Sequence, residues 1–393
     1  MTLFCKEKRK LDNKSGIIPV VFLNIYLIMY AMDVYDIRLP IDPSQIRMVI
    51  VLMGFVYAIV KLVIRPKITY FEAIALVYSM VVVFGQFVNN LLSFSKAASD
   101  LFFPLVLFVF SRLYFDRNDD KIRKTIICEN VFLIVFFALF LYASFSMKLQ
   151  YGMYLNSCYY CALLLPFALS IRKPSLRNVL MMVCLIPSIL ALKRGAYLSV
   201  TMGILLYFFA TRKTEEFRRN KNKYTMWAIV TLGCVVLVMV YMNQYMRLNI
   251  IERLLASSDD GGSGRTDLYK GMISLLQTNG IKGLLIGHGS FTSSTYLGHS
   301  SHNDFLEMLW SYGLLGFIPY VCMIWHFCVT SRRLRQQNSD FYPPCLVALV
   351  EFIICSFVSQ LVFVPSYVAF LLLLFSMAEA SLKNTKKIDL RIQ

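Results

Sequence analysis

Long runs of apolar residues, separated by short polar or charged segments, follow one another along almost the whole chain. A helix that crosses a bilayer needs roughly 20 mostly apolar residues, because the hydrocarbon core holds no water to satisfy free backbone groups. The pattern predicts about twelve such helices, with ends placed to within about 2–4 residues. They cover residues 17–35, 46–64, 70–88, 99–115, 126–146, 154–171, 176–192, 196–211, 225–243, 304–328, 344–363 and 365–381. The sequence therefore predicts an all-α integral membrane protein.

One polar stretch, residues 244–303, is much longer than the other connections between apolar runs. A long loop in a compact protein is usually either functional or disordered. Residues 248–255 and 267–276 carry apolar residues at helical spacing, and residues 257–264, rich in Gly, Ser and Asp, form a turn-prone break between them. We expect two short helices that lie on the outer membrane surface and cover a cavity.

The long loop divides the chain into three parts. The pair at 176–192 and 196–211 is short enough to fit a single interrupted helix as well as two helices. No cleavable signal peptide is predicted, because the basic start precedes a long apolar run without a small-residue cleavage site. The predicted parts are residues 1–243 with the first nine helices, residues 244–303 as the loop, and residues 304–393 with three helices and a tail.

Composition supports a membrane protein and charge gives its orientation. Hydrophobic residues make up 58% of the chain and charged residues only 16%, against about 45–50% and about 25% in soluble domains. With the N-terminus in the cytoplasm, most of the 40 Lys and Arg residues fall on the cytoplasmic side. Both termini are then cytoplasmic and the long loop is outside. Dispersed in short loops, the basic residues do not form the basic face that nucleic-acid binding needs.

The sequence predicts neither a metal site nor a disulfide framework. The pair Cys158 and Cys161 has a metal-like spacing, but it lies in an apolar run where small buried thiols are expected. The loop contains no cysteine. Its histidines His288, His299 and His302 would make a three-His set, but no second partner for them is evident and the loop between them is flexible. We therefore expect no metal and no other cofactor.

The end of the loop carries the most distinctive pattern in the chain. His302-Asn303 is followed by nine residues and then by Gly313-Leu-Leu-Gly316. Ser300 and Ser301 are good caps for the helix that follows, so we expect His302 in its first turn. The positive end of the helix dipole would disfavour the imidazolium and leave a neutral ring. Gly313 and Gly316 would leave a smooth patch for another helix.

This arrangement resembles the signature of the O-antigen ligase and polymerase superfamily. Leu192-Lys-Arg-Gly-Ala-Tyr197 is similar to that family's short Ser-Arg-Gly-like element. Gly264-Arg-Thr-Asp-Leu-Tyr269, with the later Gly287-His-Gly289, resembles the Gly-Arg and Gly-x-Gly elements of the family's large loop. Lys193 stands where many members have Ser or Thr. The resemblance covers the second half of the chain and the plan of about twelve spans, and it implies a GT-C-like architecture.

The resemblance implies a site that transfers sugars from undecaprenyl pyrophosphate at the periplasmic face of a bacterial inner membrane. Arg194 and Arg265 would hold the pyrophosphate through charge-assisted hydrogen bonds, so the reaction needs no metal in principle. His302 would be the general base for inverting transfer. Three further residues are candidates for binding the glycan or orienting the site: Asn303, Glu307 and Glu351.

Three functions remain open at this point. A polymerase adds a growing glycan to a lipid-linked repeat unit, and a ligase moves the finished glycan to lipid A–core. The compact interval from the Gly-Arg element to His302-Asn-Asp-Phe-Leu-Glu307 is more similar to the polymerases. A flippase for lipid-linked oligosaccharides also has about twelve spans, but its short loops fit less well. For a polymerase, the resemblance also implies a chain-length regulator protein as a possible partner.

Overall fold

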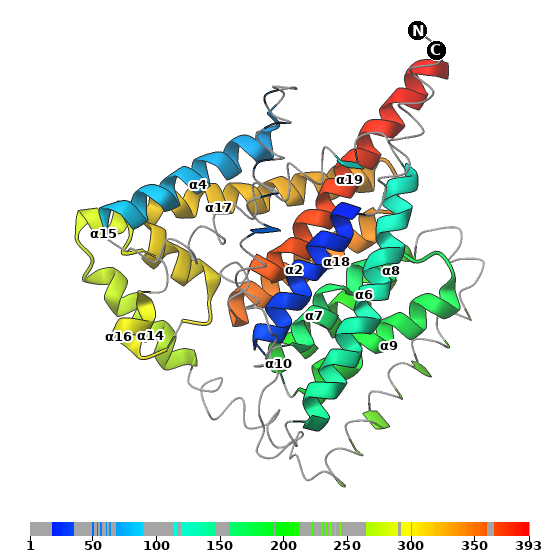
Figure 1. The fold of residues 1–393 in the computed structure, drawn as a ribbon, viewed down its shortest axis with the longest axis horizontal. Helices are drawn as coiled ribbons and strands as arrows, with labels where there is room; N and C mark the ends of the chain where they lie inside the picture. The colour runs from blue at the N-terminus through cyan, green and yellow to red at the C-terminus, as the bar shows by residue number, and fades with distance from the viewer. Residues whose placement is uncertain are drawn as a thin grey trace.

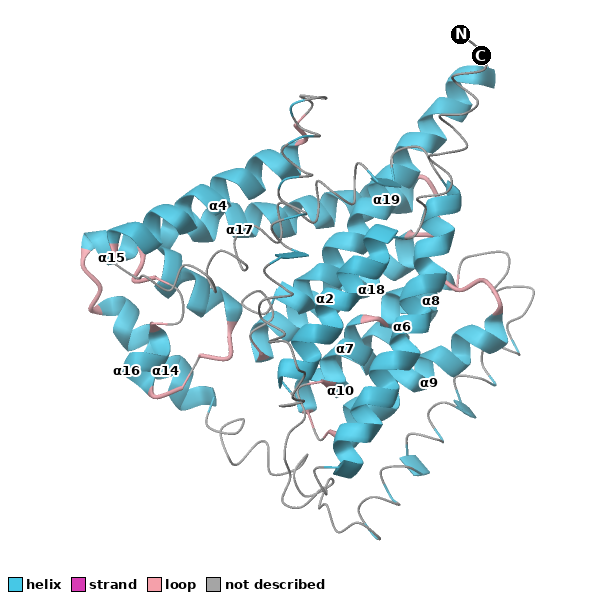
Figure 2. Ribbon diagram, in the orientation of Figure 1, coloured by secondary structure: helices cyan, strands magenta, loops and turns pink. Residues whose placement is uncertain are grey.

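The computed structural model describes residues 18–34, 68–89, 119–146, 157–191, 193–212, 265–289, 292–299, 301–359 and 365–392, together with isolated positions elsewhere. All regular secondary structure in these ranges is helical (Figure 2). The all-α prediction is therefore confirmed for the described residues. The predicted spans 46–64, 99–115 and 225–243 and the loop helix 248–255 lie wholly or mostly outside them.

Three helices are long and apolar enough to cross a membrane: α4 (Tyr70–Val88), α6 (Asp119–Ser146) and α17 (Asp304–Gln336). Seven further helices accompany them outside the loop. They are α2 (Ile18–Val34), α7 (Cys158–Leu163), α8 (Leu165–Leu169), α9 (Pro174–Leu190), α10 (Arg194–Thr211), α18 (Tyr342–Val358) and α19 (Pro365–Ile392). The protein is a membrane protein, and the number of about twelve spans stays a prediction. The short pair 176–192 and 196–211 forms two helices, α9 and α10, packed against each other.

Small residues allow α10 and α18 to approach closely. Gly195, Ser199 and Gly203 recur at every fourth position of α10 and are buried. A Cβ atom at Gly195 would lie 2.7 Å from Val358 Cγ2, and one at Gly203 would lie 2.9 Å from Val347 Cγ1. Both distances are too short for a side chain. The stripe of small residues therefore fixes the α10–α18 seam, as small residues do between membrane helices.

The long loop contributes three short helices: α14 (Arg265–Gln277), α15 (Ile281–Ile286) and α16 (Ser293–Leu297). The first confirms the predicted helix over 267–276, whereas α15 and α16 are too short to show a clear apolar period. In Figure 1 these helices gather around the start of α17, and α4 runs beside the rest of α17. The loop therefore packs on the end of a helix pair.

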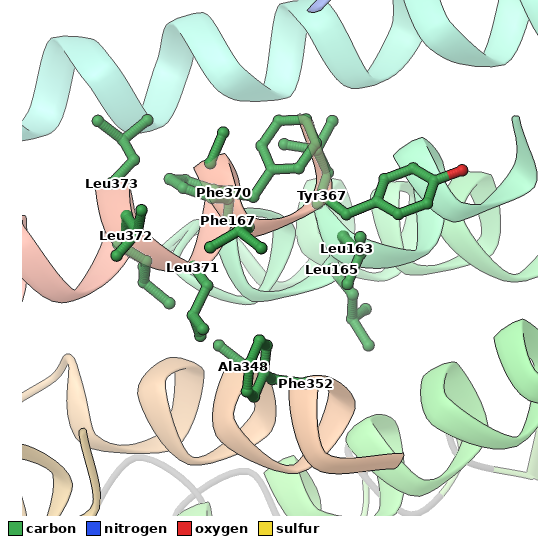
Figure 3. Close-up of a cluster of buried hydrophobic side chains, with 14 of the residues drawn as sticks. Leu163, Leu165, Phe167, Ala348, Phe352, Tyr367, Phe370, Leu371, Leu372 and Leu373 are labelled. Atoms are coloured by element: carbon green, nitrogen blue, oxygen red, sulfur yellow. The ribbon is translucent and has the colours of Figure 1, made fainter. Parts of the chain in front are cut away.

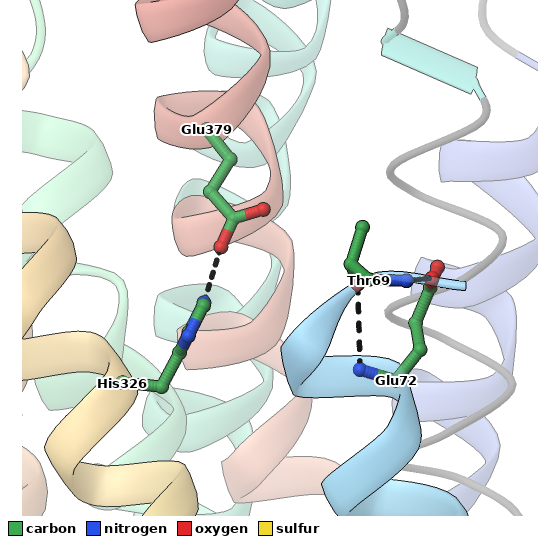
Figure 4. Close-up of polar contacts among 4 residues, drawn as sticks. All are labelled: Thr69, Glu72, His326 and Glu379. Carbon is green, nitrogen blue, oxygen red and sulfur yellow. Dashed lines mark hydrogen bonds and ion pairs between the residues drawn. The ribbon is translucent and has the colours of Figure 1, made fainter. Parts of the chain in front are cut away.

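Partly buried polar contacts occur in the part of this helix pair away from the loop (Figure 4). His326 Nε2 in α17 lies 2.5 Å from Glu379 Oε1 in α19. At the start of α4, Thr69 and Glu72 form a capping box, in which each side chain accepts a hydrogen bond from the other residue's backbone N–H. The ends of α4 and α17 are thus held in place away from the loop as well.

Candidate functional site

Asn303 caps α17. Its Oδ1 accepts hydrogen bonds from the backbone N–H groups of Phe305 at 3.0 Å and Leu306 at 3.1 Å. The helix begins at Asp304, so the expected caps at Ser300 and Ser301 were wrong. An Asn oxygen satisfies the free N–H groups of a first turn as well as a Ser oxygen does, and the geometry of the turn decides between them.

His302 consequently lies before the cap and not in the first turn of α17. Its backbone has φ 51°, in the left-handed region that few residues other than Gly adopt. Such a conformation persists only where the surroundings impose it, and it is common at functional sites. The prediction that His302 sits in the first turn of α17 was therefore wrong.

Glu307 holds that turn in place. Its carboxylate is fully buried and accepts hydrogen bonds from Ser293 Oγ at 2.5 Å, Ser301 Oγ at 2.8 Å and Ser311 Oγ at 3.5 Å. The backbone N–H of Ser301 adds a fourth contact at 3.4 Å. These donors come from α16, from the turn before α17 and from α17 itself. The carboxylate therefore joins three parts of the loop around His302.

The starts of α10, α14 and α17 meet around the C-terminal end of α18. The Tyr269 hydroxyl in α14 donates a hydrogen bond to the carbonyl oxygen of Phe357 at 2.6 Å. The rings of Phe305 and Phe357 lie 4.7 Å apart, which brings the first turn of α17 to the same place. Gly195, one residue after the start of α10, packs on Val358. Three helix N-termini, each carrying partial positive charge, thus come together.

Side-chain charges add to this positive region. The pKa of His302 is lowered by partial burial of its ring, and then by the nearby positive charges of Arg265 and Lys193 and by His299. Burial also lowers the pKa of Lys193, and Arg265 lowers it further. Lys193, Arg265 and His302 are therefore close enough to act on one another. The expected neutral imidazole is therefore favoured, and burial of the ring is the largest cause.

The Gly287-His288-Gly289 segment binds to a break in α17. The backbone N–H of His288 donates to the Trp310 carbonyl at 3.0 Å, and that of Gly289 donates to the Ser311 carbonyl at 2.8 Å. These carbonyl groups are available because α17 is interrupted at Gly313, whose φ of 60° and ψ of −165° are not helical. The segment from the loop replaces the helical hydrogen bonds that the break removes.

The close approach at this break requires glycine on both sides. A Cβ atom at Gly287 would overlap the Ser311 carbonyl group, and one at Gly313 would overlap that of Leu285. Gly313 is thus a helix break, which the sequence did not predict, but the expected close approach of another helix occurs there, because the backbone of α15 packs on it. Gly316 does face a neighbouring helix, because a Cβ atom built there would lie 3.8 Å from Val81 Cγ1 in α4.

Comparison with protein families identifies the region that forms this site. Residues 178–321 match the family model described as O-antigen ligase. This match supports a relationship of this part of the chain to the O-antigen ligase and polymerase superfamily. The match extends from α9 to the middle of α17 and includes Arg194, Arg265 and His302. A search of curated proteins finds no match to the chain.

The match to the O-antigen ligase family model supports an enzyme of the membrane glycosyltransferase type that uses lipid-linked oligosaccharides. The structure brings two of the candidate residues, Arg265 and His302, to the same place, with Asn303 and Glu307 holding the turn beside them. Arg194 is the first residue of α10, and its side chain lies outside the described part. Glu351 lies elsewhere, in the core of the helices with 1% of its surface exposed.

The sequence interpretation missed Lys193, which lies close to Arg265 and His302 in this candidate site. This lysine was treated as a replacement for the Ser or Thr of many relatives, although it directly precedes Arg194 at the start of a span. Two adjacent basic residues at a helix N-terminus are unfavourable with respect to the helix dipole, and that conflict was the available signal.

His288 of the loop and the aromatic residues Trp310 and Tyr312 of α17 serve packing. His288 stacks on Trp310 with ring centroids 4.1 Å apart, and its Nε2 lies 2.5 Å from Asn279 Oδ1. Trp310 is 3% exposed and Tyr312 2% exposed, so both belong to the core. Across the described ranges, no three His, Cys, Asp or Glu side chains are grouped so that they would hold a metal ion.

Proposed function

We propose that the protein is an O-antigen polymerase of the bacterial inner membrane, with both termini in the cytoplasm. It would transfer a glycan from undecaprenyl pyrophosphate onto a lipid-linked repeat unit at the periplasmic face. The observation that carries this proposal is the convergence of Lys193, Arg265 and His302 at the starts of three helices. The placement outside the membrane rests on the positive-inside pattern of the loops.

A gathering of positive charge is unfavourable unless it binds an anion. Two cationic side chains and three helix N-termini repel one another in a partly buried place. A pyrophosphate group reverses that repulsion, because its oxygens accept hydrogen bonds from Lys and from the bidentate guanidinium of Arg. In this scheme Arg265 and Lys193 hold the leaving group, and Arg194 joins them from the first turn of α10. Stabilisation by these groups requires no metal ion.

His302 would act as the general base. The acceptor hydroxyl attacks the anomeric carbon, the bond from that carbon to the pyrophosphate oxygen breaks, and the bonding electrons leave with the pyrophosphate. The hydroxyl proton passes to the neutral imidazole. Attack opposite the leaving group inverts the configuration at the anomeric carbon. Asn303 and Glu307 would act by positioning, because the carboxylate of Glu307 is already surrounded by serine donors.

A ligase is the second candidate, and the family description favours it. The same donor chemistry serves both enzymes, because they differ in the acceptor. The polymerase is preferred for the similarity of the compact interval that ends in His302-Asn303. A flippase, which performs no glycosyl transfer, would not require a base beside a phosphate-binding group. A chain-length regulator remains a proposed partner of the polymerase.

Lipopolysaccharide from a deletion strain distinguishes these functions on a single gel. Loss of a polymerase leaves a single repeat unit attached to core. Bare core with polymer accumulated on the carrier lipid would contradict the polymerase and indicate the ligase. Bare core with precursor facing the cytoplasm would indicate a flippase. Complementation by the wild-type gene, and failure of a His302→Asn gene to complement, ties the result to this site.

Replacing Lys193 with methionine is expected to change the pH dependence of transfer. His302 acts when it is neutral, so the rate falls as the pH drops through its pKa. Removing the nearby positive charge of Lys193 raises that pKa, and the acid limb of the pH–rate profile moves to higher pH. Loss of one charge-assisted contact should also weaken donor binding by roughly 10- to 100-fold. Lys270→Met is the matched control, because Lys270 is exposed on α14 beside Asp267; an unchanged acid limb in Lys193→Met would contradict the proposal.

A further inference from the structure

Glu351 is the one candidate residue that the proposed site does not use. It lies in α18 with 1% of its surface exposed, and neither carboxyl oxygen has a hydrogen-bond partner among the described residues. Its Oε1 faces α10, where it lies 3.2 Å from the position of a Cβ atom at Gly203. A bare carboxyl group is thus enclosed at the α10–α18 seam.

The carboxyl group borders a small cavity with an apolar lining. Its free volume, about 10 Å³, corresponds to about one water molecule. Figure 3 shows the apolar side chains that gather here from three parts of the chain. Besides Glu351, the lining consists of Leu163, Pro166, Phe167, Ala348, Phe352, Tyr367, Phe370, Leu371 and Leu374. Among the residues that the structure describes, no basic side chain lines this cavity to neutralise a carboxylate.

The cavity is chemically suited to a proton and not to a metal ion. A hard cation such as Ca²⁺ or Mg²⁺ takes about six or more oxygen ligands. Within the described part of the chain, Glu351 and Tyr367 are the only lining residues whose side chains contain oxygen. An ionised carboxylate left unpaired in such surroundings costs several kcal/mol. A bound proton removes the charge without any further ligand.

We propose that Glu351 is a proton-binding site within the membrane, held as an uncharged carboxylic acid, and that this form keeps the α10–α18 seam closed. The titratable groups that act on it or line its cavity are the thiols of Cys184 in α9 and Cys355 in α18 and the phenol of Tyr367 in α19. At Gly203, which faces the carboxyl group, α10 has no side chain that could carry a charge. None of these groups supplies a positive charge.

The seam leads to the donor site, so the proton would also control that site. α10 begins next to Lys193, and α18 ends at Val358, one residue after Phe357, whose carbonyl oxygen accepts the hydrogen bond from Tyr269 of the loop. A charge on Glu351 would draw in water and separate the two helices. This link rests on the proposed function, whereas the proton-binding site does not.

A hydrophobic carbodiimide tests the protonated state directly. Dicyclohexylcarbodiimide reacts with a carboxylic acid in membranes: the acid proton moves to one nitrogen, the carboxyl oxygen bonds to the central carbon, and the adduct rearranges to a stable N-acylurea. At neutral pH we expect mass spectrometry of purified, full-length protein to find this adduct on the Glu351 peptide, and Glu351→Gln to lack it. Protection by sodium or potassium, compared with choline, would overturn the proposal in favour of a bound cation. Glu72, whose carboxylate accepts a capping hydrogen bond, is the internal comparison.

Two substitutions test the role of the uncharged form. Glu351→Gln keeps the shape without a charge and should retain the thermal unfolding temperature in detergent and the rate of transfer. Glu351→Lys should lower the unfolding temperature and abolish transfer. A folded Glu351→Gln protein without activity would contradict the role of the uncharged form, because it would show that an ionisable carboxyl group is required. Absence of the adduct on Glu351, together with a lower unfolding temperature of Glu351→Gln, would overturn the proton-binding site. Because labelling and unfolding are measured without substrate, they give the same answer if the proposed polymerase function fails.

Discussion

His302→Asn is expected to slow the polymerisation of lipid-linked repeat units by about 10²- to 10⁴-fold, the usual contribution of a general base. Asparagine tolerates the left-handed backbone that residue 302 adopts, so the turn should survive. It has no group that accepts a proton near pH 7. Donor binding should change little, because Arg265 and Lys193 are retained. The measurement is the rate with purified protein and lipid-linked substrate under donor saturation.

His299→Asn is the matched control for this substitution. His299 is exposed in the same loop, only three residues from His302, and the proposed reaction gives it no proton to accept. Its variant should transfer at close to the wild-type rate. A wild-type rate for His302→Asn would exclude His302 as the base, and an equal loss in both variants would indicate a disturbed loop in place of lost chemistry.

Gly313→Ala is expected to release the loop from α17. An alanine in left-handed backbone costs roughly 1–2 kcal/mol, and its Cβ atom would also overlap the Leu285 carbonyl group. The substitution should therefore lower the unfolding temperature, expose residues 265–299 to protease and abolish transfer. Gly287→Ala should act in the same way. The Gly313→Ala, Gly287→Ala double variant should lose less stability than the sum of the two single losses, because both substitutions break the same contact.

Gly298→Ala and Gly280→Ala separate strain from overlap. Gly298 has a φ of 72° but open space around its Cβ position, so its variant should show only the smaller cost of backbone strain. Gly280, also with open space, has a φ of −72° and should tolerate alanine. If Gly313→Ala lost no more stability than Gly298→Ala, the contact between the loop and the helix break would not be important.

The fold class followed from the sequence because helix formation in a membrane depends on local composition. Apolar runs of the required length predicted α4, α6 and α17, and apolar spacing predicted α14. The order of three short motifs also indicated Arg265 and His302, because these residues lie in motifs that resemble those of the O-antigen ligase and polymerase superfamily. Each of these inferences uses residues close together in the chain.

Contacts between distant residues could not be predicted in this way. The sequence favoured Ser300 and Ser301 as caps, but Glu307 binds the Ser301 hydroxyl and leaves the cap to Asn303. It favoured a continuous helix through Gly313, but the break becomes acceptable only because His288 and Gly289 supply the missing hydrogen bonds. In both cases the partner comes from another turn or another helix.

The sequence by itself determined that this protein is a helical membrane protein with a large loop carrying a candidate base. Hydrophobic length and residue type are local properties, and they were sufficient for that. Only the tertiary structure decided that Lys193 joins Arg265 and His302, and that Glu351 lies in an apolar core away from them. The charge state of each group depends on its burial and neighbours, and these exist only once α10, α14, α17 and α18 have packed together.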